Sequence, residues 1–376
     1  MLHKRLITIL ILIFAFTFSV YSAEEPTSSA HSAVLINADT KEIIYAKNAY
    51  DKHSMASTTK IMTSILAIES GRFSEVVTVG KIQSEGSSIG LKEGYKLTLE
   101  SLTYGMMLES GNDAAEVVAE FLAGTEEEFS HLMNDKALEI GMTSTNFITA
   151  SGLDSEGHYS TAYDMALLGT YAIENPIFRE ICSTKNKTVR FIEPDVSMTF
   201  SNHNKLLSWC DGVFGIKTGF TKKSGRCLVT ACERSGATLV AVTLNAGDDW
   251  NDHVKLYDYG FNTIDASEVY IRLPDSIKVY GGIEKEISVE LDKNPVPISL
   301  KNDNGKLTQK IYLPKFLYAP IKTGDIIGRA DLYKDGRFIS SYHIIASDGT
   351  DSIEPLPEKK SIWSKIADKF KNYKTN

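Results

Sequence analysis

The chain has 376 residues, of which 43% are apolar and 23% are charged, and its formal net charge is −8. This composition supports sizeable hydrophobic cores in about two domains, and it excludes an intrinsically disordered chain. The acidic balance argues against nucleic acid as a partner.

Residues 1–22 have the pattern of a secretory signal. A basic start, His3 to Arg5, precedes an apolar run over 6–20, and the small residue Ser22 stands where a cut is expected. The run is shorter than the roughly 20 apolar residues of a stable membrane span, so cleavage is predicted and an uncleaved anchor is the alternative. In both cases the body of the protein lies outside the cytoplasm.

Residues 23–264 alternate between strand and helix patterns. Apolar strands over 33–37 and 42–46 predict a hairpin, and two β-rich runs over 225–232 and 238–244 predict an antiparallel pair. Between and after these strands, helical periodicity and N-cap residues predict helices over 57–70, 98–108, 112–122, 125–140, 163–174 and 252–262. We therefore expect an α+β domain, an antiparallel sheet flanked by helices and interrupted by a mostly helical insert.

The pattern changes near residue 265. Short alternating runs separated by turn residues predict strands over 269–273, 277–280, 287–291, 298–301, 307–313, 325–333 and 338–345. No helical period survives there, so residues 265–350 are predicted to form a small all-β domain. A polar, proline-containing linker follows over 351–360.

Residues 361–376 have the pattern of an amphipathic helix. Ile362, Trp363, Ile366, Phe370 and Tyr373 fall on one face, and from residue 359 onward six lysines accompany a single aspartate. Such a helix lies in a membrane interface, with lysines on anionic headgroups. A terminal helix packed on the protein itself is the alternative.

Ser57 and Lys60 form the only Ser-x-x-Lys in the chain. At the start of a helix this spacing puts both side chains on one face, within reach of each other. A serine hydroxyl becomes a good nucleophile when a base takes its proton, and a lysine serves as that base only when its pKa is strongly lowered. A capping serine beside a surface lysine is the alternative for this motif alone.

Two further motifs occur in the same domain. Ser110-Gly111-Asn112 stands in a break between two predicted helices, and Lys217-Thr218-Gly219 leads into a predicted strand. Each has a decoy: Ser144 and Asn146 also fit Ser-x-Asn, and residues 322–324 repeat Lys-Thr-Gly. We interpret the first decoy as a loop after a helix end and the second as a turn in the β domain.

With these motifs the chain resembles the D-alanyl-D-alanine carboxypeptidases, which are low-molecular-mass penicillin-binding proteins of the serine type. The resemblance covers the chain from about Ser32 to its end. The segments that carry it are residues 56–63, 110–114, 152–154, 158–160 and 215–219. It implies a β-lactamase/transpeptidase-like catalytic domain, followed by the β domain and the amphipathic tail.

The resemblance also implies a role for each motif residue. Ser57 would attack the carbonyl between two D-alanines of a peptidoglycan stem peptide, Lys60 would take its proton, and Ser110 would pass a proton to the leaving amine. The remaining contacts to substrate would come from Asn112, Lys217, Thr218, Gly219 and Phe220. The backbone N–H groups of Ser57 and Phe220 would form the oxyanion hole. β-Lactams would be covalent inhibitors, and the protein would act on the outer face of the cytoplasmic membrane.

Two positions depart from the family pattern. Phe220 stands where well-known members have a histidine after Lys-Thr-Gly, which puts side-chain contacts to the substrate in doubt. Some relatives bind the substrate's carboxylate with an arginine on a later loop, but residues 248–252 contain none. Without an arginine on that loop, the substrate's terminal carboxylate is bound by Thr218 and Lys217 alone.

Three other functions stay open. A β-lactamase on the same fold would need a group that activates water, for which Glu156 is the candidate, although we interpret it as a loop carboxylate. Endopeptidase or transpeptidase activity would use the same motifs. A protein of another class, a non-catalytic β-lactam-reactive or wall-binding module, would keep the fold without turnover.

The four cysteines, Cys182, Cys210, Cys227 and Cys232, include no Cys-x-x-Cys and no zinc-ligand spacing with histidine. We expect them to be mostly free and partly buried, with one disulfide as the alternative. We expect neither a metal nor a cofactor.

Overall fold

The structure is a computed structural model that describes residues 25–83, 85–292, 296–301 and 305–353. The predicted signal segment, the predicted tail helix and most of the predicted linker lie outside the described residues. None of the helices in the described part of the chain is long and apolar enough to cross a bilayer.

A five-stranded antiparallel sheet forms the centre of the larger part of the molecule. Its strand order is β2-β1-β9-β8-β7, so the N-terminal hairpin joins strands that come much later in the chain. The strands are β1 (Ser32–Asn37), β2 (Ile43–Lys47), β7 (Val213–Thr221), β8 (Gly225–Arg234) and β9 (Ala237–Ala246). Both predicted antiparallel pairs are confirmed, with slightly different bounds.

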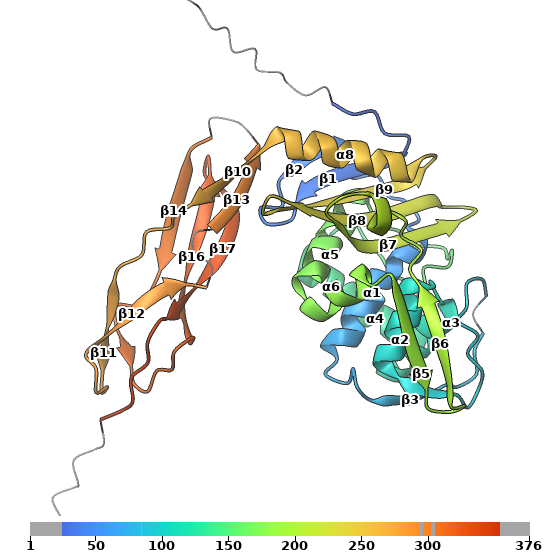
Figure 1. Ribbon diagram of the computed structural model, residues 1–376, viewed down its shortest axis with the longest axis horizontal. Helices are drawn as coiled ribbons and strands as arrows, with labels where there is room; N and C mark the ends of the chain where they lie inside the picture. The colour runs from blue at the N-terminus through green and yellow to red at the C-terminus, as the bar shows by residue number, and fades with distance from the viewer. Residues whose placement is uncertain (1–24, 84, 293–295, 302–304, 354–376) are drawn as a thin grey trace, which may run out of the picture.

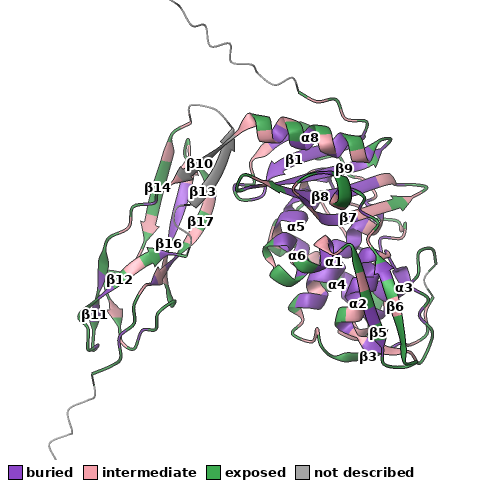
Figure 2. Ribbon diagram, in the orientation of Figure 1, coloured by how far each residue is buried: buried purple, intermediate pink, exposed green. Residues whose placement is uncertain are grey.

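Helices cover both faces of this sheet (Figure 1). Alternate residues of β1 point to opposite faces, so Leu35 packs beneath α8 (Asp249–Thr263) while Val34 and Ile36 face the helical layer on the other side. All six residues of β1 are therefore buried, and Figure 2 shows the sheet interior in purple.

The second layer is largely the predicted helical insert. It contains a 3₁₀ turn η1 (Ala56–Thr59), α1 (Lys60–Glu69), α2 (Leu99–Leu108), α3 (Asn112–Ala123), α4 (Glu126–Ile140), α5 (Ala162–Glu174) and α6 (Pro176–Ser183). The predicted N-caps are confirmed, because the Thr98 and Thr125 side chains accept hydrogen bonds from Ser101 N and Glu128 N. Two short hairpins flank the helices, β3 (Val76–Thr78) with β4 (Lys96–Thr98) and β5 (Asn186–Phe191) with β6 (Val196–Ser201).

Residues 176–210 carry elements that the sequence analysis did not assign: α6, the β5–β6 hairpin and α7 (Leu206–Trp209). Pro176 is the first residue of α6, which follows α5 almost directly. Asn175 caps that helix by accepting hydrogen bonds from Ile177 N and Phe178 N.

The smaller part of the chain is all-β, as predicted. Six strands form one sheet in the order β14-β16-β17-β12-β11-β15, and β10 pairs with β13. Their bounds are β10 (Ile264–Val269), β11 (Ser276–Tyr280), β12 (Glu286–Leu291), β13 (Val296–Lys301), β14 (Leu307–Tyr312), β15 (Leu317–Tyr318), β16 (Ile326–Lys334) and β17 (Arg337–Ala346). The strand predicted over 269–273 is wrong, because β10 follows α8 directly and ends at Val269.

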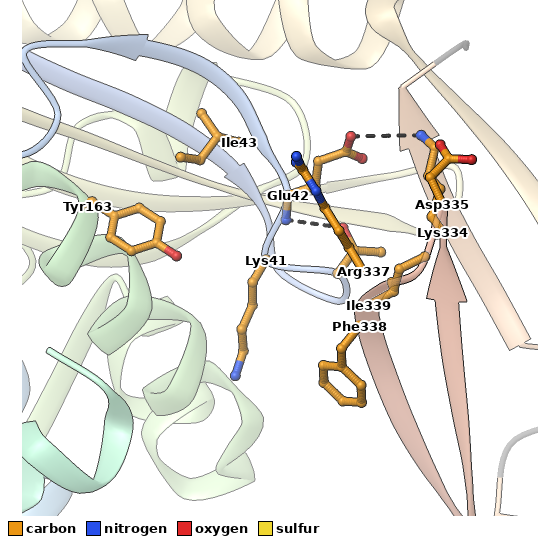
Figure 3. A pocket seen from close by; sticks show the side chains of 10 residues that line it. Lys41, Glu42, Ile43, Tyr163, Lys334, Asp335, Arg337, Phe338 and Ile339 are labelled. Atoms are coloured by element: carbon orange, nitrogen blue, oxygen red, sulfur yellow. Dashed lines mark hydrogen bonds and ion pairs between the residues drawn. The ribbon is translucent and has the colours of Figure 1, made fainter. Parts of the chain in front are cut away.

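The two parts meet where the β1–β2 turn approaches the β16–β17 turn. Lys334 Nζ lies 3.8 Å from Glu42 Oε1, and the hollow around this pair is also lined by Lys41, Tyr163 and Phe338 (Figure 3). None of the residues that line it belongs to the three motifs described above.

Two sequence predictions need correction. Lys217-Thr218-Gly219 itself lies inside the nine-residue strand β7, which the sequence analysis did not predict, and the predicted strand after it is β8. The four cysteines are all free and all buried, so the expected partial burial and the alternative of a disulfide are both wrong.

Candidate active site

Ser57 and Lys60 lie together at the start of α1, as their spacing predicts. Ser57 is in the 3₁₀ turn η1, and Lys60, the first residue of α1, is fully buried. Lys60 Nζ is 2.8 Å from Ser57 Oγ, 2.7 Å from Asn112 Oδ1 and 2.6 Å from the carbonyl oxygen of Ser151. Three oxygens therefore fix the amine beside the serine hydroxyl.

The environment of Lys60 favours the neutral amine. Burial, and next the positive charge of Lys217, lower the pKa of Lys60 well below 10.5, whereas Asp113 acts in the opposite direction. A neutral amine within hydrogen-bond distance of a serine hydroxyl can accept its proton.

Ser110 and Lys217 form a second pair. Ser110 occupies the break between α2 and α3 with a φ of 64°, and Lys217 comes from the middle of β7. Lys217 Nζ donates to Ser110 Oγ at 3.1 Å and to the carbonyl oxygen of Thr218 at 3.0 Å. Burial lowers the pKa of Lys217 to about 7.

Strand β7 passes close to Ser57. A Cβ atom added to Gly219 would lie 3.0 Å from the backbone nitrogens of both Ser57 and Thr58, so only a residue without a side chain allows this approach. Phe220, the next residue, has 67% of its surface exposed. The backbone of β7 and the N–H of Ser57 are therefore neighbours.

These residues surround a hollow of about 280 Å³. Its lining residues are Ser57, Ser87, Ser110, His203, Thr218, Gly219, Phe220, Arg226, Asp249 and Trp250. The sequence-predicted residues Ser57, Ser110, Thr218, Gly219 and Phe220 line it directly. Lys60 and Lys217 do not line the hollow, but they donate hydrogen bonds to Ser57 and Ser110, which do.

Asn112 lies beside the serine–lysine pair. Its Oδ1 accepts from Lys60 and its Nδ2 donates to the carbonyl oxygen of Glu85 at 2.6 Å. Both ends of the amide are thus engaged within the protein, and Asn112 orients Lys60 in addition to the substrate contact that the resemblance implies.

The decoys and the alternative catalytic carboxylate lie elsewhere. Ser144 is in a turn after α4, and Lys322 is in the turn before β16. Glu156 is exposed and does not line the hollow. Among the described residues, no three or more His, Cys, Asp or Glu side chains are grouped so as to hold a metal ion.

The sequence analysis missed Arg226, Asp249 and Trp250. Arg226 lies on β8 directly opposite Phe220 of β7, and Asp249 and Trp250 form the first turn of α8. The available signal was the register of the hairpin, since a turn after Thr221 brings residue 226 back alongside the Lys-Thr-Gly strand.

A serine hydroxyl 2.8 Å from the amine of a buried lysine, in a turn packed between an antiparallel sheet and a helical layer, is the arrangement expected of a serine-type acyl-transfer enzyme. Comparison with known proteins supports this class. Residues 19–248 match the D-alanyl-D-alanine carboxypeptidase family, and residues 262–351 match the C-terminal domain of penicillin-binding protein 5.

Individual relatives agree with these matches. The chain is 31% identical to D-alanyl-D-alanine carboxypeptidase DacF of Bacillus subtilis over 93% of this chain and 94% of the relative. It is also 31% identical to DacC of Escherichia coli over 90% of each chain. Penicillin-binding protein 5 of Haemophilus influenzae superposes with a TM-score of 0.63 at 26% identity, over 87% of this chain and 99% of the other.

The DD-transpeptidase of Streptomyces K15 superposes with a TM-score of 0.61 at 30% identity, over 63% of this chain and 99% of the other. The chain belongs to the D-alanyl-D-alanine carboxypeptidase family. It is a serine-type carboxypeptidase, a cell-wall hydrolase that acts on the D-Ala-D-Ala terminus of peptidoglycan and reacts with β-lactams as a penicillin-binding protein.

Proposed function

We propose that Ser57 is the nucleophile of this carboxypeptidase and Lys60 its general base. The observation that carries this assignment is the 2.8 Å contact between Lys60 Nζ and Ser57 Oγ in a site that favours the neutral amine. Lys60 takes the hydroxyl proton as Ser57 Oγ attacks the carbonyl carbon between the two D-alanines.

The negative charge of the tetrahedral intermediate forms next to backbone donors. The N–H groups of Ser57 and Phe220 are assigned as the oxyanion hole, supported by the close approach of Gly219 to Ser57 N. These donors stabilise the transition state more than the bound substrate, because negative charge develops on the carbonyl oxygen only as Ser57 attacks.

Departure of D-alanine requires a proton on its amine. Ser110 delivers its hydroxyl proton and regains the one that Lys60 took from Ser57, so Lys60 becomes neutral again, and Lys217, 3.1 Å from Ser110 Oγ, keeps the local potential positive. Thr218, Gly219 and Asn112 orient the substrate. Water then hydrolyses the ester on Ser57 and regenerates the enzyme.

Labelling by a fluorescent penicillin tests the two central assignments. We expect a covalent adduct on the wild-type chain and none on Ser57→Ala or Lys60→Ala, with folding of each variant checked by thermal unfolding. A covalent adduct on Ser57→Ala would contradict the assignment of Ser57 as the nucleophile. A folded wild-type chain without any adduct would favour the non-catalytic binding module.

The lifetime of that adduct separates two enzymes on this fold. A carboxypeptidase holds the penicilloyl group for long, whereas a β-lactamase turns it over rapidly. We expect slow decay together with D-alanine release from a stem-peptide mimic. The exposed position of Glu156, away from the hollow, supports this expectation.

We also propose how the chain is arranged at the cell surface. The catalytic domain would span residues 23–264, the β domain 265–350 would act as a spacer, and residues 361–376 would bind anionic lipid on the outer face of the membrane after removal of residues 1–22. Support comes from the sequence patterns of the two terminal segments and from the order of the domains.

Deletion of residues 361–376 tests the lipid contact. We expect the shortened protein to be released from membranes while keeping its penicillin labelling, with the mature N-terminus verified by mass spectrometry. Retention on the membrane in spite of a cleaved signal would contradict the proposal.

A further inference from the structure

The hollow beside Ser57 contains a guanidinium that none of the roles above uses. Arg226 lines it together with Ser57, Thr218 and Phe220. In register, Arg226 faces Phe220 across the β7–β8 pair, and Thr218 is two residues away on the same strand as Phe220. Directly opposite side chains are about 5 Å apart at Cβ and diagonal ones about 7–8 Å, so a long arginine reaches the Thr218 segment.

Arg226 is held in place by two residues of α8. Its Nε and Nη2 donate to Asp249 Oδ1 at 2.9 and 2.6 Å, and its Cζ lies 5.5 Å from the centre of the Trp250 ring. The Asp249 side chain is 4% exposed, whereas that of Arg226 is 42% exposed. One edge of the guanidinium is therefore fixed to a buried carboxylate.

An arginine has five N–H donors in a planar fork. Among the described residues, the hydrogen bonds of the Arg226 side chain go to Asp249 and use only Nε and Nη2. The Arg226 side chain is 42% exposed and lines the hollow, so donors that Asp249 does not use remain accessible to a ligand. A planar fork fixed in advance is suited to a carboxylate, because little side-chain entropy is lost when it binds.

We infer that Arg226 binds the free carboxylate of the substrate's terminal D-alanine, with Asp249 and Trp250 as positioning residues. The inference rests on the proposed function and deepens it. It also accounts for residues 248–252, which contain no arginine: their Asp249 and Trp250 orient an arginine supplied by the neighbouring strand. The carboxylate then does not rest on Thr218 and Lys217 alone.

A specificity follows from this assignment. A terminal residue with a free carboxylate gains a charge-assisted contact, whereas one whose carboxyl group is an amide gains a weaker one. The hollow thus selects uncapped D-Ala-D-Ala ends over ends that are amidated.

The test compares two substrates in the full chain: an N-acyl-D-Ala-D-Ala peptide and the same peptide with a C-terminal amide. For Arg226→Gln we expect kcat/KM to fall about 10- to 100-fold on the acid and to change less than about twofold on the amide. Most of the loss should appear in KM. Arg226→Lys, which keeps the charge without the fork, should retain part of the acid preference.

The same strand offers a matched control. Arg234, at the other end of β8, pairs with Asp258 of α8 at 3.2 Å and lies over the Phe261 ring at 5.0 Å, but it does not line the hollow. Arg234→Gln removes a similar strand-to-helix tie, so we expect its acid-to-amide ratio to equal that of the wild type. Asp249→Asn should lower the ratio less than Arg226→Gln does.

The outcomes are distinguishable. If kcat/KM falls equally on the acid and the amide in both Arg226 variants, Arg226 has a structural role only and the inference is overturned. The inference is also overturned if Arg226→Gln leaves the acid-to-amide ratio of kcat/KM unchanged. Release of neither D-alanine nor D-alaninamide by the wild-type chain would instead overturn the proposed function itself.

Discussion

Two buried lysines, Lys60 and Lys217, carry the chemistry proposed for this site, and they do so in opposite protonation states. Burial lowers the pKa of both, and the charge of Lys217 lowers that of Lys60 further. A charged Lys217 therefore favours the neutral form of Lys60 that the proposed base role requires, and Lys217 itself keeps its charge below about pH 7. In the proposed mechanism, their surroundings give the two lysines different functions.

This arrangement predicts a bell-shaped pH profile for acylation by penicillin. The rate rises with pH as Lys60 becomes neutral, and it falls above about pH 7 as Lys217 loses the charge that supports proton delivery through Ser110. Lys217→Arg keeps its charge throughout, so the falling limb should disappear. The measurement is the second-order acylation rate between about pH 5 and about pH 10. A falling limb that persists in folded Lys217→Arg would contradict the assignment to Lys217.

At the residue scale, motifs within one helix turn or one strand were predictable. Ser57 and Lys60 share a helix face by spacing alone, and the structure brings them to 2.8 Å. Arg226 was not predictable in that way, because its neighbours Thr218 and Asp249 belong to other elements. Its place depends on the register of the β7–β8 hairpin, for which the turn after Thr221 is the only sequence signal, and on where α8 begins, so no motif within one element contains it.

At the scale of elements, the segment 149–154 fixes the catalytic turn from behind. The carbonyl oxygens of Ala150 and Ser151 accept from Thr63 Oγ1 and Lys60 Nζ, both at 2.6 Å. Gly152, with a φ of 84°, lets this segment pass so close that an added Cβ would lie 2.0 Å from the carbonyl oxygen of Ala56. The segment and η1 therefore determine each other's position.

Replacement of Gly152 by alanine tests this contact. Backbone strain and the clash with Ala56 should destabilise the fold by about 3 kcal/mol, and displacement of Ser151 should slow penicillin acylation. Urea unfolding and labelling rates measure the two effects. Gly157→Ala is the control, because its φ of 81° is similar but its nearest contact is at 3.7 Å, so about 1 kcal/mol of strain is expected. Equal losses in the two variants would rule out the specific clash.

Elements with clear end signals were predicted well. Thr98 and Thr125 begin helices where N-cap chemistry places them. Strand β7 was misjudged because Lys217 and two glycines interrupt its apolar character, although the strand is held by pairing with β8 along its length. Tertiary pairing overrides local propensity there.

At the scale of the whole molecule, the catalytic part and the β domain have separate cores. The buried residues around the five-stranded sheet form two clusters, and those of the β domain form two others. The Streptomyces K15 structures match 63% of this chain with nearly the whole of their own length, so relatives exist without a β domain.

A chain that ends after Thr263 should therefore fold and react with penicillin at a rate within about twofold of the full chain. The comparison requires labelling kinetics and thermal unfolding of both forms. Loss of labelling in a folded shortened chain would show that the β domain contributes to the site.

The layered α+β class and the all-β domain were predictable from periodicity, but the order of the strands was not. Strand β1 lies between β2 and β9 with all of its residues buried. An apolar run such as Ser32–Asn37 is suited to any interior position of a sheet, so its sequence does not specify which strands flank it.

That strand order has a consequence for biosynthesis. Ser32 lies opposite Leu244, so the first strand to leave the ribosome waits for one of the last strands of the catalytic part. Strand β2 pairs with one edge of β1 early, but at about 5–20 residues per second the edge that pairs with β9 stays open for about ten seconds or more, and pairing over such a distance along the chain is slow. Nascent chains of this enzyme therefore need protection from aggregation until residue 246 has emerged, and the active serine is assembled only after that point.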